Sequence, residues 1–130
     1  MLSLSPSVRI YVCLTPTDMR CQFDGLAAMV KHTFERDIFT GDYFVFLNRA
    51  ADRCKILCWD RDGYCLWSKR LELGRFQIPA FDGVSLLAEI DGTTLAMILG
   101  GVDLQSVKRR KRYQRPPRDA VAQAPAISIA

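Results

Sequence analysis

Between residues 43 and 78 the chain contains four short runs of strand-forming residues, separated only by turn-length segments. The runs are Tyr43–Leu47, Arg53–Trp59, Tyr64–Leu71 and Arg75–Ile78. The connecting segments contain Asn, Asp and Gly, which favour tight turns because they tolerate unusual backbone angles or bond to their own backbone. Strands joined by turns of this length pair antiparallel. The sequence therefore predicts an antiparallel β-meander as the centre of the fold.

The first of these runs differs from the later ones in its pattern of burial. Tyr43–Leu47 is apolar on both faces, which predicts a central strand. The next two runs carry Arg53, Lys55, Lys69 and Arg70. We therefore expect the later strands to keep one face in solvent.

A strand and a helix are expected before the meander. Val8–Leu14 reads as a strand that ends at a polar, proline-containing turn. Apolar residues at helical spacing then predict a helix from about Asp24 to Glu35. Asp24 is well placed to cap its first turn by accepting a hydrogen bond from a free backbone N–H.

A strand and a short helix are expected after the meander. Val84–Ile90 predicts a further strand, and Leu95–Leu99 a short helix. Thr93 or Thr94 is a candidate cap for the start of this helix, and Gly100 with Gly101 is expected to end it.

This order of elements predicts an α+β fold in a single domain: an N-terminal strand and helix, an antiparallel β-meander, a short C-terminal helix and a basic mobile tail. A chain of 130 residues is long enough for one ordinary domain and too short for two. We expect residues 1–107 to form the domain. Residues 108–130 are basic and then rich in Pro and Ala, and we expect them to be disordered because they offer little apolar surface to bury.

The excess positive charge lies in one segment. Residues 1–107 contain 11 basic and 13 acidic side chains, whereas residues 108–118 contain seven basic side chains and no acidic one. Such a run attracts phosphates and releases their counterions, so it predicts salt-sensitive, mostly non-specific DNA binding. The alternatives are a tail that only aids solubility or one that meets an acidic protein. The predicted nucleic-acid-binding residues are Lys108, Arg109, Arg110, Lys111, Arg112, Arg115 and Arg118.

The meander is a second candidate for nucleic-acid binding. Its basic residues lie close in sequence to three aromatic ones, and cations beside aromatics suit contact with phosphates and stacked bases. Aromatic residues in strands more often pack in a core, and we favour that interpretation for Trp59 and Trp67. The basic residues concerned are Arg53, Lys55, Lys69, Arg70 and Arg75, and the third aromatic is Tyr64.

The sequence offers little for catalysis, metal or cofactor binding. His32 is the only histidine in the sequence. Cys54 and Cys58 form one close pair of possible ligands, but the second close pair that a zinc site usually needs is missing. No phosphate-binding glycine loop or nucleophile motif is present. A metal-dependent nuclease would need converging carboxylates, for which the candidates are Asp18, Asp24, Asp60 and Asp62, but the last two flank a turn where Asp is expected anyway. We expect no catalytic residue, no metal and no cofactor.

Cysteine content and hydropathy indicate the compartment. Five cysteines are an odd number, and the N-terminal residues lack the basic and apolar regions of a secretion signal. We therefore expect buried thiols in a cytoplasmic protein. Charged residues interrupt every apolar run well before the roughly 18–20 residues of a membrane span.

Eight ordered sequence blocks resemble one family, the TnpB accessory proteins of insertion-sequence-66 transposons. The resemblance covers about residues 8–115, and the segment Ile98–Leu104 followed by basic residues also looks like that family. The unrelated RNA-guided nuclease that shares the name TnpB is much larger. The matching blocks are Val8–Val12, Pro16–Arg20, Phe23–Leu26, Phe44–Phe46, Lys55–Asp60, Gly63–Trp67, Lys69–Glu72 and Gly74–Phe76.

The resemblance implies participation in DNA transposition beside a separate, larger transposase that carries the catalytic acids. It brings no catalytic or binding residue with it. We therefore expect a non-catalytic accessory protein whose tail contacts DNA and whose body contacts the transposase or other proteins of the element. A pure protein-interaction module is the alternative, and a nuclease is a weaker one. The polar turn Thr17–Arg20 suits either a partner contact or the fixing of the turn itself.

Overall fold

The computed structural model describes residues 7–78 and 82–101, and in this part of the chain it shows the α+β fold that the sequence predicts. The basic tail, and with it the expectation of disorder and the domain boundary at residue 107, lies outside the described residues. No helix within the described ranges is long and apolar enough to cross a membrane. The elements are β1 (Ile10–Cys13), α1 (Phe23–Ala28), the π-helical η1 (Met29–Thr33), the 3₁₀-helical η2 (Ile38–Thr40), β2 (Tyr43–Leu47), β3 (Arg53–Asp60), β4 (Gly63–Arg70), β5 (Leu87–Ile90) and α2 (Gly92–Gly100).

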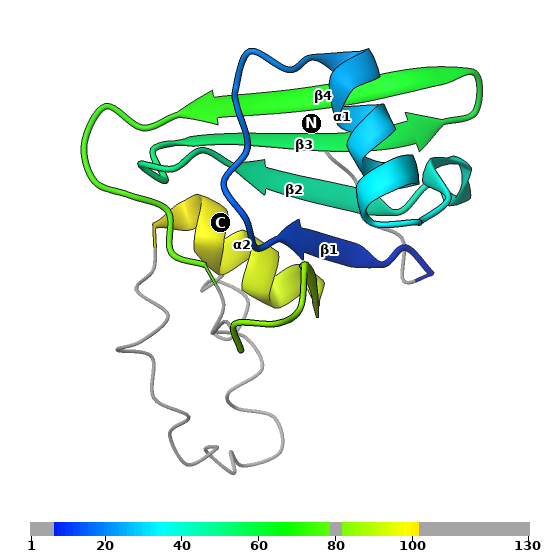
Figure 1. The fold of residues 1–130 in the computed structure, drawn as a ribbon. Coiled ribbons are helices and arrows are strands. Elements are labelled where there is room, and N and C mark those ends of the chain that lie inside the picture. Colours follow the sequence, from blue (N-terminus) through cyan, green and yellow to red (C-terminus); the bar gives the residue numbers. More distant parts are fainter. Residues whose placement is uncertain (1–6, 79–81, 102–130) are drawn as a thin grey trace, which may run out of the picture.

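The strands form one five-stranded mixed sheet in the order β4-β3-β2-β1-β5 (Figure 1). Strands β2, β3 and β4 are antiparallel neighbours, which confirms the predicted meander. Strand β1 pairs in parallel with β2, because the segment that contains α1 crosses over the sheet between them, and β5 pairs antiparallel with β1. Strand β2 is therefore central and buried along its whole length, as predicted.

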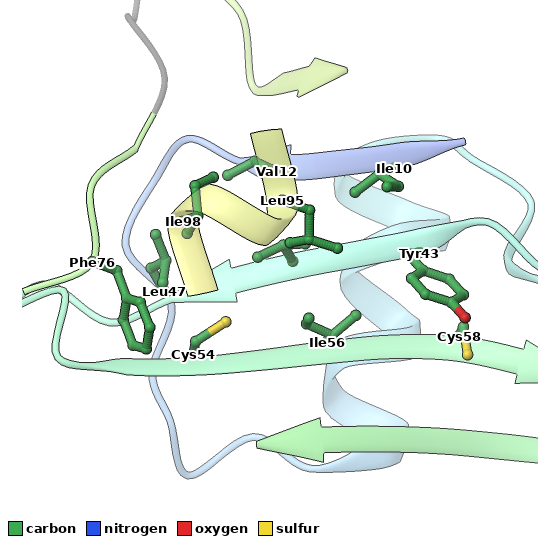
Figure 2. Close-up of a cluster of buried hydrophobic side chains, with 11 residues drawn as sticks. Ile10, Val12, Tyr43, Leu47, Cys54, Ile56, Cys58, Phe76, Leu95 and Ile98 are labelled. Carbon is green, nitrogen blue, oxygen red and sulfur yellow. The ribbon is translucent and has the colours of Figure 1, made fainter. Parts of the chain in front are cut away.

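The side chains of the central strands alternate between two hydrophobic clusters, one on each face of the sheet. The face that we call the α2 face packs Val12, Val45 and Ile56 against Leu95 and Ile98 of α2 (Figure 2). The opposite α1 face packs Phe44, Phe46 and Leu57 against Leu26 of α1 and Val30 of η1. Because both faces are covered, the middle of β3 is buried on both sides. The expectation of a solvent-exposed face on the later strands is wrong for β3.

The first helical segment ends near the predicted residue but begins earlier. Gln22 is the N-cap of α1, and Asp24 lies inside the first turn, so the predicted capping role of Asp24 is wrong. The backbone already closes the first helical bond from Leu26 N to Gln22 O. The π-helical turn of η1 continues the segment to Thr33.

The second helix is capped by a residue that sequence analysis did not select. The Asp91 carboxylate accepts a hydrogen bond from the backbone N–H of Thr94 at 2.8 Å, so neither Thr93 nor Thr94 is the cap. The same hydrogen bond lowers the pKa of Asp91. The helix ends at Gly100, and Gly101 follows in the left-handed conformation with φ of 84°, in agreement with the predicted glycine stop.

Two of the predicted strands, both after β4 in the chain, differ from what the structure shows. Arg75–Ile78 is an irregular segment, so this predicted strand is wrong. Phe76 buries its ring in the α2-face cluster and donates its backbone N–H to Ala51 O. Strand β5 begins at Leu87, three residues later than Val84, because the preceding residues form a turn around Asp82. The Asp82 carboxylate accepts hydrogen bonds from the backbone N–H groups of Val84 and Ser85.

All five cysteines are free thiols, and the predicted burial is confirmed for three of them but wrong for Cys65. Cys13, Cys54 and Cys58 are buried, whereas Cys21 is partly buried and Cys65 exposed. Burial raises the pKa of Cys54 to about 12 and that of Cys58 to about 11. These two thiols therefore stay protonated at neutral pH and act as small apolar groups.

Candidate nucleic-acid interface

A groove of about 550 Å³ lies on the α1 face, lined by the segment that leads into α1 and by the open end of the β3–β4 hairpin. Figure 1 shows how these two parts of the backbone are arranged. Its lining contains basic, polar and apolar side chains and no Asp or Glu. We call it the basic groove. Its lining residues are Met19, Gln22, Phe23, Arg53, Lys55, Leu66, Ser68, Lys69 and Arg70.

The strand register concentrates positive charge in the basic groove. Arg53 of β3 lies directly opposite Arg70 of β4, and Lys55 lies opposite Ser68. Residues directly opposite in an antiparallel pair have Cβ atoms only about 5 Å apart, so like charges there repel. All three cations share the α1 face, because Arg53 and Lys55 are two residues apart on one strand.

Lys55 is buried beside this pair, with 8% of its surface exposed. Its ammonium group donates hydrogen bonds of 2.8 Å to the carbonyl oxygens of Met19 and Cys21, and so fixes the segment before α1 onto the sheet. Within the described residues Lys55 has no ion pair with a carboxylate. Carbonyl dipoles satisfy the N–H donors without cancelling the formal charge, so the cation keeps the floor of the groove positive.

The two arginines differ in how they are engaged. The Arg53 side chain is exposed and forms no ion pair with a described carboxylate, although its backbone N–H bonds Asn48. Arg70 contacts Glu72 at 3.0 Å, but both side chains are largely exposed. Exposed pairs contribute little stability, about 0–1 kcal/mol, so Glu72 competes weakly with any other anion.

The other two cations of the predicted meander site lie elsewhere. Lys69 contributes to the groove lining, but its ammonium group donates to Leu99 O of α2 on the opposite face of the sheet, at 3.1 Å. Arg75 lines a separate, smaller hollow of about 170 Å³ together with Arg49. The five cations that sequence analysis grouped therefore do not form one surface.

The aromatic residues of the meander pack rather than line the basic groove. Trp59 makes edge-to-face contacts with Phe39 and Tyr64, with ring centroids 4.9 Å and 5.0 Å apart, against the α1-face cluster. Trp67 packs against the cluster on the α2 face. The core interpretation of both tryptophans is confirmed.

The candidate acidic residues do not converge. Asp24 lies in α1, and Asp60 and Asp62 lie at the end of β3 and in the hairpin turn. Among the residues that the structure describes, no three or more His, Cys, Asp or Glu side chains gather as a metal site. The single histidine of the chain, His32, is exposed on η1.

The polar turn before α1 is fixed by its own side chains. The Asp18 carboxylate accepts hydrogen bonds from the backbone N–H of Arg20 at 2.9 Å and from its guanidinium group at 2.7–3.1 Å. These bonds lower the pKa of Asp18 to about 2. Thr17 is buried and its N–H bonds Leu47 O, which ties the turn to the end of β2.

The seven basic residues from Lys108 to Arg118 lie outside the described part of the chain, so their role as DNA contacts stays a prediction. In their place the structure adds groove residues that sequence analysis did not select, chiefly Gln22, Phe23 and Ser68. Phe23, the first residue of α1, is 44% exposed, which is a large exposure for a phenylalanine. Only the strand register could have placed Ser68 beside Lys55.

The fold and the groove define a small α+β protein with two covered sheet faces and a cationic hollow at one end. Residues 8–109 match the family model described as IS66 Orf2 like protein, and the chain belongs to this family. The family implies an accessory protein related to transposition. Family members are generally accessory proteins rather than catalytic ones.

Two relatives from Sinorhizobium fredii are similar over most of their length. Uncharacterized protein y4hO is 35% identical over 103 residues, which cover 79% of this chain and 88% of the relative. Uncharacterized protein y4jC is 33% identical over 120 residues, which cover 92% of this chain and all of the relative. No solved structure matches significantly.

Proposed function

We propose that this protein is a non-catalytic accessory factor of DNA transposition that acts in the cytoplasm with a separate transposase. In this proposal the basic tail contacts DNA without marked sequence preference, and the folded body contacts the transposase or another protein of the element. The division of charge carries the proposal: a near-neutral body is followed by seven basic side chains within residues 108–118. Membership of the family supports the setting in transposition.

The composition of the tail determines how it would bind. Each cation that neutralises a phosphate releases condensed counterions, so the observed affinity falls steeply with salt. Reading a base requires side chains held in fixed, often bidentate geometry against its edge. A cationic run gives phosphate contact without that geometry, so binding should be similar on all DNA sequences.

The test neutralises four tail residues in the full chain. Replacing Arg109, Arg110, Lys111 and Arg112 with Ala removes about four possible phosphate contacts, which should flatten the logarithmic salt dependence by up to roughly 3.6 on duplex DNA. Fluorescence anisotropy at several salt concentrations, with transposon ends and random duplexes, measures the change. Both duplexes should weaken alike. Loss of binding to the transposon ends alone would make the tail a specific reader and contradict the proposal.

A pure protein-interaction module is the second candidate, favoured by the near-neutral body of residues 1–107. In that case the tail meets an acidic partner and never touches nucleic acid. Co-purification with the element's transposase, repeated after nuclease treatment, distinguishes direct contact from bridging through DNA, and the absence of any duplex binding by the purified protein would favour the interaction module. Association that survives the nuclease supports direct contact with the transposase, whereas association that disappears shows bridging through DNA.

A further inference from the structure

Within the described residues the carboxylates form no ion pair with Arg53 or Lys55 of the basic groove, and Arg70 has only the exposed pair with Glu72. Arg53 and Arg70 face each other across the β3–β4 pair, and the buried ammonium group of Lys55 donates to two backbone carbonyl oxygens. A protein gains no stability from like charges placed opposite each other. A bound anion would convert this repulsion into attraction, since arginine forks match the oxygens of a phosphate in bidentate geometry.

The rim of the groove adds a stacking surface to the cations. Phe23 lines the groove and is 44% exposed, and Met19 and Leu66 line it as well. Ser68 and Gln22 add hydrogen-bonding groups. Cations together with an exposed aromatic ring are what proteins use to hold single-stranded nucleic acid, in which phosphates follow the charge and an unpaired base stacks on the ring. The volume of about 550 Å³ falls within the roughly 300–1,000 Å³ of small-ligand sites.

We propose that the basic groove binds a segment of single-stranded DNA, with a phosphate between Arg53 and Arg70 and a base against Phe23. A base inside a duplex is stacked and paired, so it cannot present its flat side to Phe23. The groove and the tail would thus contact different forms of DNA. The groove binds an unpaired DNA strand, and the tail binds the phosphates of any DNA. The choice of DNA as the nucleic acid rests on the proposed function, whereas the phosphate site rests on the geometry of the groove.

The test keeps the chain at full length and removes the contribution of the tail. In the background variant the seven basic tail residues, from Lys108 to Arg118, are changed to Gln. A fluorescent oligothymidine of about 12 nucleotides and a duplex of equal length serve as probes. The background protein should retain binding to oligothymidine, with a preference for it over the duplex. A background protein that does not bind oligothymidine overturns the proposal.

Arg53→Gln with Arg70→Gln in this background should lower the affinity for oligothymidine about tenfold or more. Two lost phosphate contacts should also flatten its logarithmic salt dependence by roughly 1.4. The matched control, Lys31→Gln with Arg61→Asn, removes two charges at η1 and at the far end of the hairpin, and Asn tolerates the positive φ of Arg61. The control should bind as the background does. Equal effects of the two double variants would show that net charge alone decides, and would reject the site.

Two further variants test the base-stacking contact and the phosphate site separately. Phe23→Leu keeps an apolar side chain without a ring, so it should weaken oligothymidine binding about fivefold and leave duplex binding unchanged. Glu72→Gln removes the only described ion-pair partner of Arg70 and should strengthen binding. If Phe23→Leu changes nothing, the base-stacking part of the proposal is wrong. Weaker binding by Glu72→Gln would contradict the phosphate site.

Photocross-linking locates the strand without relying on affinities. Wild-type protein is irradiated with oligothymidine that carries 5-iodouracil, and the modified peptide is identified by mass spectrometry. Cross-links within residues 19–23 support the groove, and cross-links confined to the tail overturn it. The outcome that contradicts the proposed function is a different one: the variant with seven tail residues changed to Gln would bind duplex DNA as tightly as the wild type does.

Discussion

The two ends of the β3–β4 hairpin are built from the same pair of strands and yet differ in chemistry. At the turn end, Trp59 contacts Tyr64 and Phe39 edge to face, and these rings cover the end of the sheet. At the open end, Arg53 lies opposite Arg70. One end places groups that attract each other in contact, whereas the other places groups that repel.

The comparison shows why proximity in sequence did not predict which basic residues lie together. Aromatic and basic residues are interspersed along the hairpin sequence, which suggests one mixed surface. The register separates them by up to six positions along β3, or about 20 Å. The aromatic end stabilises the fold, and the cationic end is available for a ligand.

Substitution at the turn end should have the largest effect on stability. Trp59→Ala removes two ring contacts and leaves space beside Phe39 and Tyr64. We expect the free energy of unfolding to fall by about 3 kcal/mol, because losing a buried aromatic side chain typically costs 3–5 kcal/mol and Trp59 is only partly buried. Urea denaturation measures the change. DNA affinity should not change, and a loss of affinity in protein that is still folded would place the binding surface at this end.

Lys55→Met should affect both stability and binding. Methionine fills similar space but donates no hydrogen bond, so the carbonyl groups of Met19 and Cys21 lose their partner. We expect a loss of about 2 kcal/mol in urea denaturation, and weaker binding of oligothymidine by the tail-neutralised protein. Unchanged stability would show that water replaces the ammonium group, and that Lys55 does not fix the segment before α1.

Asp91, the N-cap of α2, lies outside the β3–β4 hairpin, so its substitution tests stability away from both ends of the hairpin. Asp91→Ala should lower the free energy of unfolding by about 1 kcal/mol at neutral pH. Because the hydrogen bond lowers the pKa of Asp91 in the folded state, the stabilisation is present above the pKa of the unfolded chain, about 3.9, and is lost as the pH falls through the folded value. The difference between wild type and Asp91→Ala should therefore shrink below about pH 4. Asp91→Asn, which caps without titrating, is the control, and a difference that stays constant down to pH 2 would contradict this origin.

Arg53→Gln should have the smallest effect on stability, and of the opposite sign. It relieves the repulsion from Arg70 and breaks no described ion pair, so stability should rise by a few tenths of a kcal/mol. Thermal unfolding at low salt, where surface charges are least screened, measures it. A rise in stability together with weaker oligothymidine binding would show that Arg53 contributes to ligand binding and not to the stability of the fold. A clear loss of stability would instead show that Arg53 has a structural role.

The sequence predicted those parts of the fold that depend on local patterns. Alternation and turn residues defined β2, β3 and β4, and helical spacing located α1, because these signals act over a few residues. Pairing between distant segments was not predictable in the same way. The parallel pairing of β1 with β2 and the position of β5 beside β1 depend on which segments meet in space.

The candidate site shows the same limit. Lys55 has the sequence context of a surface residue, since it alternates with apolar neighbours on a strand. Its burial arises from the segment that crosses above it and supplies two carbonyl oxygens from residues 34 and 36 positions away. Phe76 likewise looked like part of a strand, and only its contacts with Ala51 and the α2-face cluster show it to be a single anchor.

The position of β1 has a consequence for how the protein forms during synthesis. Strand β1 is made before the other described strands, but it lies inside the sheet between β2 and β5. Until the ribosome has released the chain as far as Ile90, β1 has an unpaired edge with free N–H and C=O groups, of the kind that invites pairing with another chain. The nascent protein therefore passes through a stage in which β1 can pair with another chain, and arrival of β5 ends that stage.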